Sequence, residues 1–239
     1  MSSKNHKNSD PVCSDCANSF DNLFCKIKGS KLDELIDEKT FTKYSKGEFI
    51  FKEGTRPFGI FCMKSGKVKL VKAGEDGRNH ILRLHRPGDL LGYRSLFNET
   101  GYNASAIALE DCEICFIQRE MFLKLVKEDS DLAFDLLKML SEDLKRADIH
   151  LTNLAQKPVR ERAAEALIFI QETYGFAEDG KTIDAIFTRE DIANIVGTAT
   201  ETIIRVLSDF NKEGVVSLVG KKIIIPEIQE LKRIANSFE

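Results

Sequence analysis

Two charged side chains near the end of the chain, Glu201 and Arg205, have the chemistry that reads bases in DNA. An arginine can donate two hydrogen bonds to O6 and N7 of guanine, and a glutamate can accept one from N4 of cytosine. Because the two residues are four positions apart, a helix would project them side by side. An ordinary surface ion pair has the same spacing, so the interpretation depends on the element that carries the pair.

The residues around this pair, 188–226, predict such an element. Thr188 is a good N-cap, and Asp191 can answer it in a capping box. Gly197 can close this first helix because it readily adopts a left-handed conformation. Apolar residues between these signals fall on one helical stripe: Ile192, Ile195 and Val196. The pattern is typical of the first helix of a helix-turn-helix.

A second helix and a hairpin follow, which together predict a winged helix-turn-helix. Thr198 or Thr200 can cap the helix, and the run VVSLVGKKIIIP alternates around a Gly220-Lys221 turn. The expected buried face consists of Ile203, Val206, Leu207 and Phe210. The expected DNA-contacting residues are Glu201, Ile204 and Arg205 for bases, and Thr200, Thr202, Lys221 and Lys222 mainly for phosphates.

Six cysteines form a second group that could do chemistry: Cys13, Cys16, Cys25, Cys62, Cys112 and Cys115. The Cys13-x-x-Cys16 pair followed by Cys25 is a spacing at which three thiolates can surround one soft metal centre. A four-thiolate zinc site, direct thiol redox chemistry and no metal at all are the alternatives.

Upstream of the helix-turn-helix, the sequence predicts a β domain at residues 30–128. Nine of the fifteen glycines lie between residues 47 and 101, and they separate short apolar runs at near-regular spacing. This pattern is typical of a small antiparallel sandwich or barrel. The preceding residues 1–29 form a polar arm that carries three of the cysteines.

Between the two domains, residues 129–156 predict a long helix. Apolar residues from Ala133 onward are spaced alternately by four and three, which is the heptad pattern of a two-helix seam. We therefore expect a homodimer whose interface contains Leu137, Leu140, Leu144, Ala147, Leu151 and Leu154. Pro158 breaks this helix, and residues 157–239 form the expected DNA-binding domain.

This α+β order of antiparallel β-roll, dimerisation helix and C-terminal winged helix-turn-helix resembles the CRP/FNR superfamily of bacterial transcription regulators. The resemblance covers residues 30–235, and its most specific motif is GTATETIIRVLSDF, which is similar to the family's recognition helix. It implies that Glu201 and Arg205 read bases in double-stranded DNA on a two-fold operator, and that RNA polymerase is a partner. Ile204 departs from the small residue that the family usually has between them.

The resemblance also implies what the protein senses. Three N-terminal cysteines and one internal cysteine are similar to the oxygen-responsive FNR branch, in which a [4Fe–4S] cluster has four such ligands. Cys115 matches the internal position, with Cys112 and Cys62 as competitors, although eight residues between Cys16 and Cys25 exceed the branch's usual five. The hypothesis is a regulator that binds DNA best with an intact cluster. The alternative is a metal-free regulator that responds to another small ligand or is controlled by abundance.

Cyclic AMP is not expected as the ligand. In the family, an acidic residue after the PGD turn and an arginine about ten residues later hold the ribose and the cyclic phosphate. The corresponding stretches here are Gly92-Tyr93 and Asn103-Ala104-Ser105, so both charged groups are missing.

Composition sets the remaining bounds. The chain has 239 residues and a net charge of −3, and residues 157–239 alone contain 11 Lys/Arg and 14 Asp/Glu, so the DNA-binding half is not a basic module. No apolar run could span a bilayer and no secretory signal is evident, so we expect a cytoplasmic protein without a membrane partner. The four histidines are dispersed and no catalytic motif joins them, so an enzyme is not expected.

Overall fold

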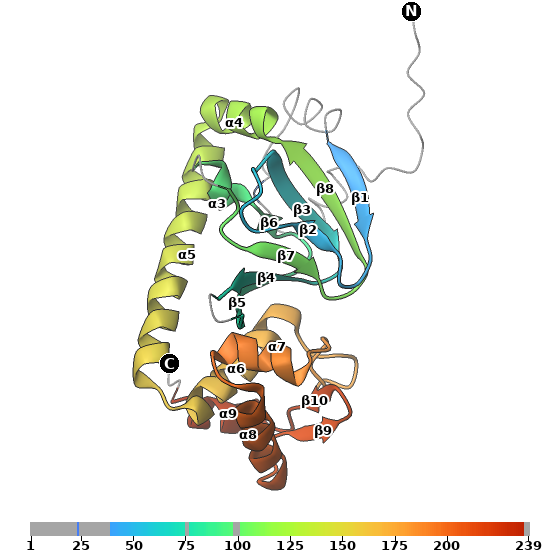
Figure 1. Ribbon diagram of the computed structural model, residues 1–239, viewed down its shortest axis with the longest axis vertical. Helices are drawn as coiled ribbons and strands as arrows, with labels where there is room; N and C mark the ends of the chain where they lie inside the picture. Colours follow the sequence, from blue (N-terminus) through green and yellow to red (C-terminus); the bar gives the residue numbers. More distant parts are fainter. Residues whose placement is uncertain (1–22, 24–38, 75–76, 98–100, 237–239) are drawn as a thin grey trace, which may run out of the picture. The chain divides into compact units, whose positions relative to one another are not determined.

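The change from strands to helices that the sequence predicts is present in the computed structural model (Figure 1). The structure describes Leu23 and residues 39–74, 77–97 and 101–236. These residues form two compact units, the first made of residues up to 68 and residues 85–142, the second of residues 69–84 and 143–239. Within the described ranges, no helix is both long and apolar enough to cross a membrane.

Two four-stranded sheets make up the β domain, and both contain antiparallel strand pairs. The first has the order β1-β8-β3-β6 and the second β2-β7-β4-β5. Their strands are β1 (Thr40–Tyr44), β2 (Phe49–Phe51), β3 (Gly59–Ser65), β4 (Val68–Ala73), β5 (Asn79–His85), β6 (Leu90–Leu91), β7 (Ser105–Ala108) and β8 (Cys112–Gln118). The interleaved order confirms the expected antiparallel roll.

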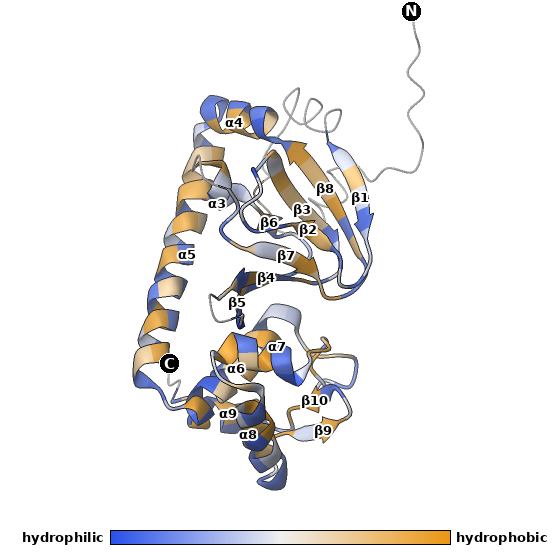
Figure 2. Ribbon diagram, in the orientation of Figure 1, coloured by the Kyte–Doolittle hydropathy of each residue, from blue (hydrophilic) through white to orange (hydrophobic). Residues whose placement is uncertain are grey.

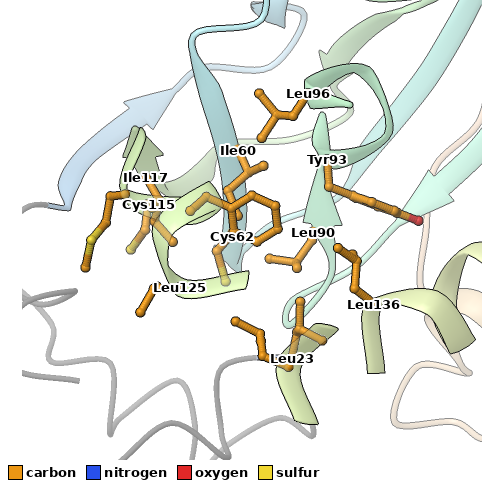
Figure 3. Packing of buried hydrophobic residues seen from close by; sticks show 13 residues of the cluster. Leu23, Ile60, Cys62, Leu90, Tyr93, Leu96, Cys115, Ile117, Leu125 and Leu136 are labelled. Atoms are coloured by element: carbon orange, nitrogen blue, oxygen red, sulfur yellow. The ribbon is translucent and has the colours of Figure 1, made fainter. Parts of the chain in front are cut away.

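The sheet that contains β3 and β8 is covered on both faces, and strand alternation sorts their residues between two cores. On one face, Phe61 of β3 stacks on Phe51 of β2, with ring centroids 5.5 Å apart. The other face belongs to an apolar cluster that contains Ile60, Cys62, Cys115 and Ile117 (Figure 3). Two-sided burial explains why the middle of β8, residues 114–117, is a continuous apolar run rather than an alternating one.

Helices close the second of these cores. One of them is the short helix α3 (Tyr93–Leu96). Another is α4 (Arg119–Glu128), which follows β8 directly and contributes Phe122 and Leu125 to the cluster. The long helix α5 (Ser130–Gln156) follows, and its first turns add Leu132 and Leu136 (Figure 1). Apolar residues continue along the whole length of α5, beyond this contact (Figure 2).

The C-terminal part contains four helices among the described residues, together with a hairpin. They are α6 (Val159–Tyr174), α7 (Arg189–Val196), α8 (Thr200–Lys212) and α9 (Ile228–Ile234), with β9 (Ser217–Val219) and β10 (Lys222–Ile224) between the last two helices. Strands β9 and β10 pair antiparallel across the two-residue Gly220-Lys221 turn, and Gly220 has the positive φ of 60° that this turn requires. The winged helix-turn-helix is therefore confirmed, as is the α+β class.

Candidate nucleic-acid interface

Helix α7 begins with the capping box that the sequence predicts. The Asp191 amide donates to Thr188 Oγ1 at 3.0 Å, and the Thr188 amide donates to the Asp191 carboxylate at 3.0 Å. Two amides that the helix start would leave without partners are satisfied in this way. The position of α7, and so of the turn after it, is fixed by this local interaction.

Asp191 also has a partner from far away in the sequence. Lys69 of β4, which belongs to the same compact unit, donates to Asp191 Oδ1 at 2.5 Å. Burial alone would raise the pKa of Asp191, but the hydrogen bonds from Lys69 and Thr188 outweigh burial and hold this pKa below its ordinary value. Lys69 is 122 positions from Asp191, and no local signal in the sequence marks it as a partner.

The turn after α7 is tight because Gly197 adopts a left-handed conformation with φ 70° and ψ 52°. Its amide donates to the Ala193 carbonyl at 2.9 Å, and the Thr198 amide donates to the same carbonyl at 3.1 Å. Helix α8 then begins after Ala199, whose carbonyl accepts from Thr202 and Ile203. The expected side-chain cap from Thr198 or Thr200 was wrong, because these backbone bonds set the start of α8 and no side chain caps it.

Helix α8 has one face in the core and one in solvent. Ile203, Leu207 and Phe210 have no exposed surface. Because a helix turns about 100° per residue, Glu201 and Arg205 lie on the opposite side, where both are exposed. Ile204, which lies between them in the sequence, has 49% of its surface exposed, an unusual position for a branched apolar side chain.

The remaining predicted DNA contacts lie at the start of α8 and on the wing. Thr200 and Thr202 are partly exposed in the first turn of α8, and Lys221 and Lys222 are exposed at the tip of the β9–β10 hairpin. The hairpin is held near its turn by Arg189, which donates to the Gly220 carbonyl at 3.4 Å. The structure thus leaves the hydroxyl and ammonium groups accessible on two adjacent elements of one domain.

Two of the three cysteines in the roll lie on one face of their sheet, and the third lies on the other face. Cys62 of β3 is directly opposite Cys115 of β8, and both thiols belong to the apolar cluster (Figure 3). Cys112 lies on the other face of β8, as the sequence predicts, where its thiol donates to the Glu110 carbonyl at 3.1 Å. Burial raises the pKa of the Cys112 thiol, which disfavours the thiolate that metal binding needs.

The predicted ligands Cys13, Cys16 and Cys25 lie outside the described residues. Leu23, two positions before Cys25, is described, and it packs into the cluster that contains Cys62 and Cys115. In the part of the chain that the structure describes, no three His, Cys, Asp or Glu side chains gather as a metal site.

The predicted dimer face of α5 divides into exposed and partly covered positions. Leu137, Leu144 and Leu151 are 62–67% exposed, whereas Leu140 packs partly against the cluster of its own chain and Leu154 is half-buried. Ala147 is exposed. Phe134, one turn before Leu137 and 59% exposed, extends the apolar line; its spacing of three from Leu137 could have identified it.

Comparison with known proteins gives the same two parts. Residues 41–129 match the cyclic nucleotide-binding domain, and residues 161–234 match the Crp-like helix-turn-helix domain. The chain is 32% identical over 215 residues to the cyclic AMP receptor protein of Thermus thermophilus, which covers 89% of this chain and 96% of that one. It is 31% identical over 208 residues to the transcriptional activator protein anr of Pseudomonas aeruginosa, with coverages of 85% and 83%. The solved structure of FixK2 from Bradyrhizobium japonicum is similar with a TM-score of 0.74 at 25% identity, covering 84% and 99%.

The capping box at α7 makes a prediction about stability and pH. Asp191→Asn should lower the free energy of unfolding at pH 7 by about 1–2 kcal/mol, because it removes a charged cap and the partner of Lys69. Since the folded-state pKa lies below the unfolded one, the carboxylate stabilises the fold above the unfolded pKa, and this contribution is lost as pH falls through the folded pKa. The difference between wild type and variant in urea unfolding should therefore shrink below about pH 4. Glu190→Gln, in the same turn, is the control and should cost only a few tenths of a kcal/mol; an equal loss in both variants would contradict the cap.

Proposed function

Because the chain belongs to the CRP/FNR family of DNA-binding transcription regulators, we propose that it acts as a homodimer that places two copies of α8 in successive major grooves of a two-fold operator. The observation that carries this proposal is the exposed Glu201–Arg205 pair on a helix whose opposite face is fully buried. A helix-turn-helix presents its second helix to the groove in this orientation.

Base recognition falls to three side chains on α8. Arg205 donates to a guanine and Glu201 accepts from a cytosine. The two side chains lie one helical turn from each other on the exposed face of α8. Ile204 has no hydrogen-bonding group, and its exposed apolar surface fits the methyl group of a thymine. This combination predicts a half-site in which a G·C pair is read next to an A·T pair.

Phosphate contacts position the helix without reading sequence. Thr200 and Thr202 lie beside the N-terminus of α8, where the backbone amides and the helix dipole favour an anion. Lys221 and Lys222 extend the contact from the wing, and both are exposed. These groups set the register on the duplex.

The dimer seam follows from the exposed apolar line on α5. Phe134, Leu137, Leu144 and Leu151 are each at least 59% exposed, and their spacing repeats every seven residues from Leu137 onward. An apolar stripe of this kind is stabilised by a second copy of the same helix, which buries it in a coiled-coil contact.

Arg205→Ala should weaken binding to a two-fold duplex, selected from a random pool by the wild-type protein, by about 10–100-fold. It should also relax the preference at one base pair of each half-site, because one bidentate contact is lost. Lys212→Ala removes a cation from the same helix at its far end, where Lys212 pairs with Asp209, and should change affinity little. Fluorescence anisotropy measures both. Equal affinity of Arg205→Ala and wild type would exclude α8 as the reading helix.

Leu151→Asp should convert the dimer to a monomer, because it would bury two like charges in the seam; we expect dimerisation at least about tenfold weaker. Thr152→Asp introduces the same charge at the next position, outside the heptad seam, and should leave the dimer intact. Sedimentation equilibrium gives the mass, and circular dichroism shows that both variants are folded. A wild-type chain that is monomeric at micromolar concentration, in air and under argon, would refute the seam.

We further propose that the regulator responds to oxygen through a [4Fe–4S] cluster held by Cys13, Cys16, Cys25 and Cys115. The roll supplies thiols on the face where Leu23 packs, and Leu23 lies between Cys16 and Cys25 in the sequence. Four thiolates are the donor set that such clusters need. Bound there, the cluster would supply an oxygen-sensitive link between the arm and the roll. Cys62, opposite Cys115 on the same face, is the second thiol within reach.

Cyclic AMP does not fit the corresponding part of the roll. Tyr93 and Ala104 are buried, and neither offers a charge for the ribose or the phosphate. Tyr102 fills the space beside Gly92: a Cβ added at Gly92 would lie 3.1 Å from the Tyr102 ring. We therefore propose that cyclic AMP is not the signal, although the domain has the cyclic nucleotide-binding fold.

Protein purified without air should be brown and contain about four iron and four sulfide per chain. Cys115→Ser should lose most of this iron, because it removes the proposed ligand on the face of β8 where Leu23 packs. Cys112→Ser is the matched control and should keep its iron, because its thiol lies on the other face. Iron and sulfide assays and the visible spectrum measure the outcome. A colourless anaerobic protein that still binds DNA would leave the metal-free regulator as the answer.

A further inference from the structure

Two histidines that DNA binding does not use face each other in the second compact unit. His80 is on β5 and His150 is on α5, and their Nε2 atoms are 3.1 Å apart. The ring centroids are 5.3 Å apart. His80 is half-buried, and His150 is exposed at the surface of α5, so solvent reaches the pair.

The surroundings of His80 distinguish its two ring nitrogens: one meets the backbone of Asn194 and the other faces His150. Its ring donates to the backbone carbonyl of Asn194, and because Nε2 faces His150, the donor is Nδ1. His80 Nδ1 also lies beside the turn, 4.0 Å from a Cβ added at Gly197. With its proton on Nδ1, the neutral ring leaves the lone pair of Nε2 on the side that faces His150.

The surroundings of both rings favour the neutral form. Burial lowers the pKa of His80, and the bond to Asn194 offsets this only in part. Burial, His80 and the positive charge of Arg162 lower the pKa of His150. A neutral imidazole whose other nitrogen donates to a backbone carbonyl has the state and orientation of a metal-ligating histidine.

We propose that His80 and His150 form a two-histidine site for a divalent transition-metal ion that prefers imidazole, such as Zn²⁺ or Ni²⁺. Two nitrogens bound at about 2.0–2.1 Å and separated by about 90–110° at one ion lie about 2.9–3.4 Å apart, which includes the observed distance. Water completes the coordination from the open side. The nearby Arg162 opposes the cation, so the site is weaker than a closed three- or four-ligand site.

The site would join three elements of the same unit. His150 comes from the second half of α5 and His80 from β5, while Asn194, the residue that orients His80, lies in α7 three positions before Gly197. Bound metal should therefore raise the melting temperature of the protein, because an ion that binds only the folded state stabilises it.

The test is a titration of the full-length, tag-free chain with Ni²⁺ and Zn²⁺ by calorimetry. Cys13, Cys16 and Cys25 are replaced by serine so that thiolates of the arm do not contribute. We expect one ion per chain, at least tenfold weaker binding in both His80→Gln and His150→Gln, and a metal-induced rise in melting temperature that both variants lose.

The other two histidines provide the controls. His85→Gln and His6→Gln remove the remaining imidazoles and should leave the affinity unchanged. Circular dichroism and metal-free melting show whether His80→Gln and His150→Gln are folded. Absence of binding at millimolar metal, or binding that survives in either His80→Gln or His150→Gln, would overturn the proposal and leave the pair as a hydrogen bond between two neutral rings.

Discussion

The burial of one face of α8 is the constraint on which the DNA-binding interpretation depends. Ile203, Leu207 and Phe210 have no exposed surface, so the helix cannot rotate about its axis without exposing them. A rotation by one residue would also carry Glu201 or Arg205 toward the core, where an uncompensated charge is very unfavourable. The direction of the two charged groups is therefore set by apolar packing on the opposite side of the helix. Ion-pair partners for the two charges are not needed to set it.

The direction of each thiol in β8 is set by strand alternation, just as the direction of Glu201 and Arg205 is set by the period of the helix. Sheet residues of β8 divide between two covered faces, so Cys115 and Ile117 enter one cluster while Cys112 faces the other way. Three positions of separation would place Cys112 and Cys115 on one side of a helix but place them on opposite sides of a strand. The proposed cluster would draw its fourth thiol from the face where Leu23 packs. The face of β8 on which each cysteine lies therefore distinguishes Cys115 from Cys112 as a candidate ligand.

Features decided within a few residues were predictable from the sequence. The capping box of Thr188 and Asp191, the left-handed Gly197 and the two-residue wing turn each depend on a local pattern, and all are present. Features decided by strand register or tertiary contact were not. Lys69 is 122 positions from Asp191, and Cys62 faces Cys115 only because β3 and β8 pair in one particular register. The predicted threonine cap of α8 is absent, because Ala199 occupies the N-cap position and no side chain caps the helix.

The charge of the C-terminal domain supports the proposal that two copies bind DNA together. Residues 157–239 contain 11 Lys/Arg against 14 Asp/Glu, so the domain gains little from the general attraction of a cation for the duplex. The contacts proposed for it are confined to a few groups on α8 and the wing, and one half-site would offer only these few against repulsion from the acidic remainder. A two-fold dimer doubles the contacts while the position of the second helix is already fixed by the first. The same acidity weakens binding to unrelated sequences, where the base contacts are absent but the repulsion remains. Because this repulsion acts on every sequence alike, the ratio of specific to non-specific binding is set by the base contacts, and a dimer would double their number.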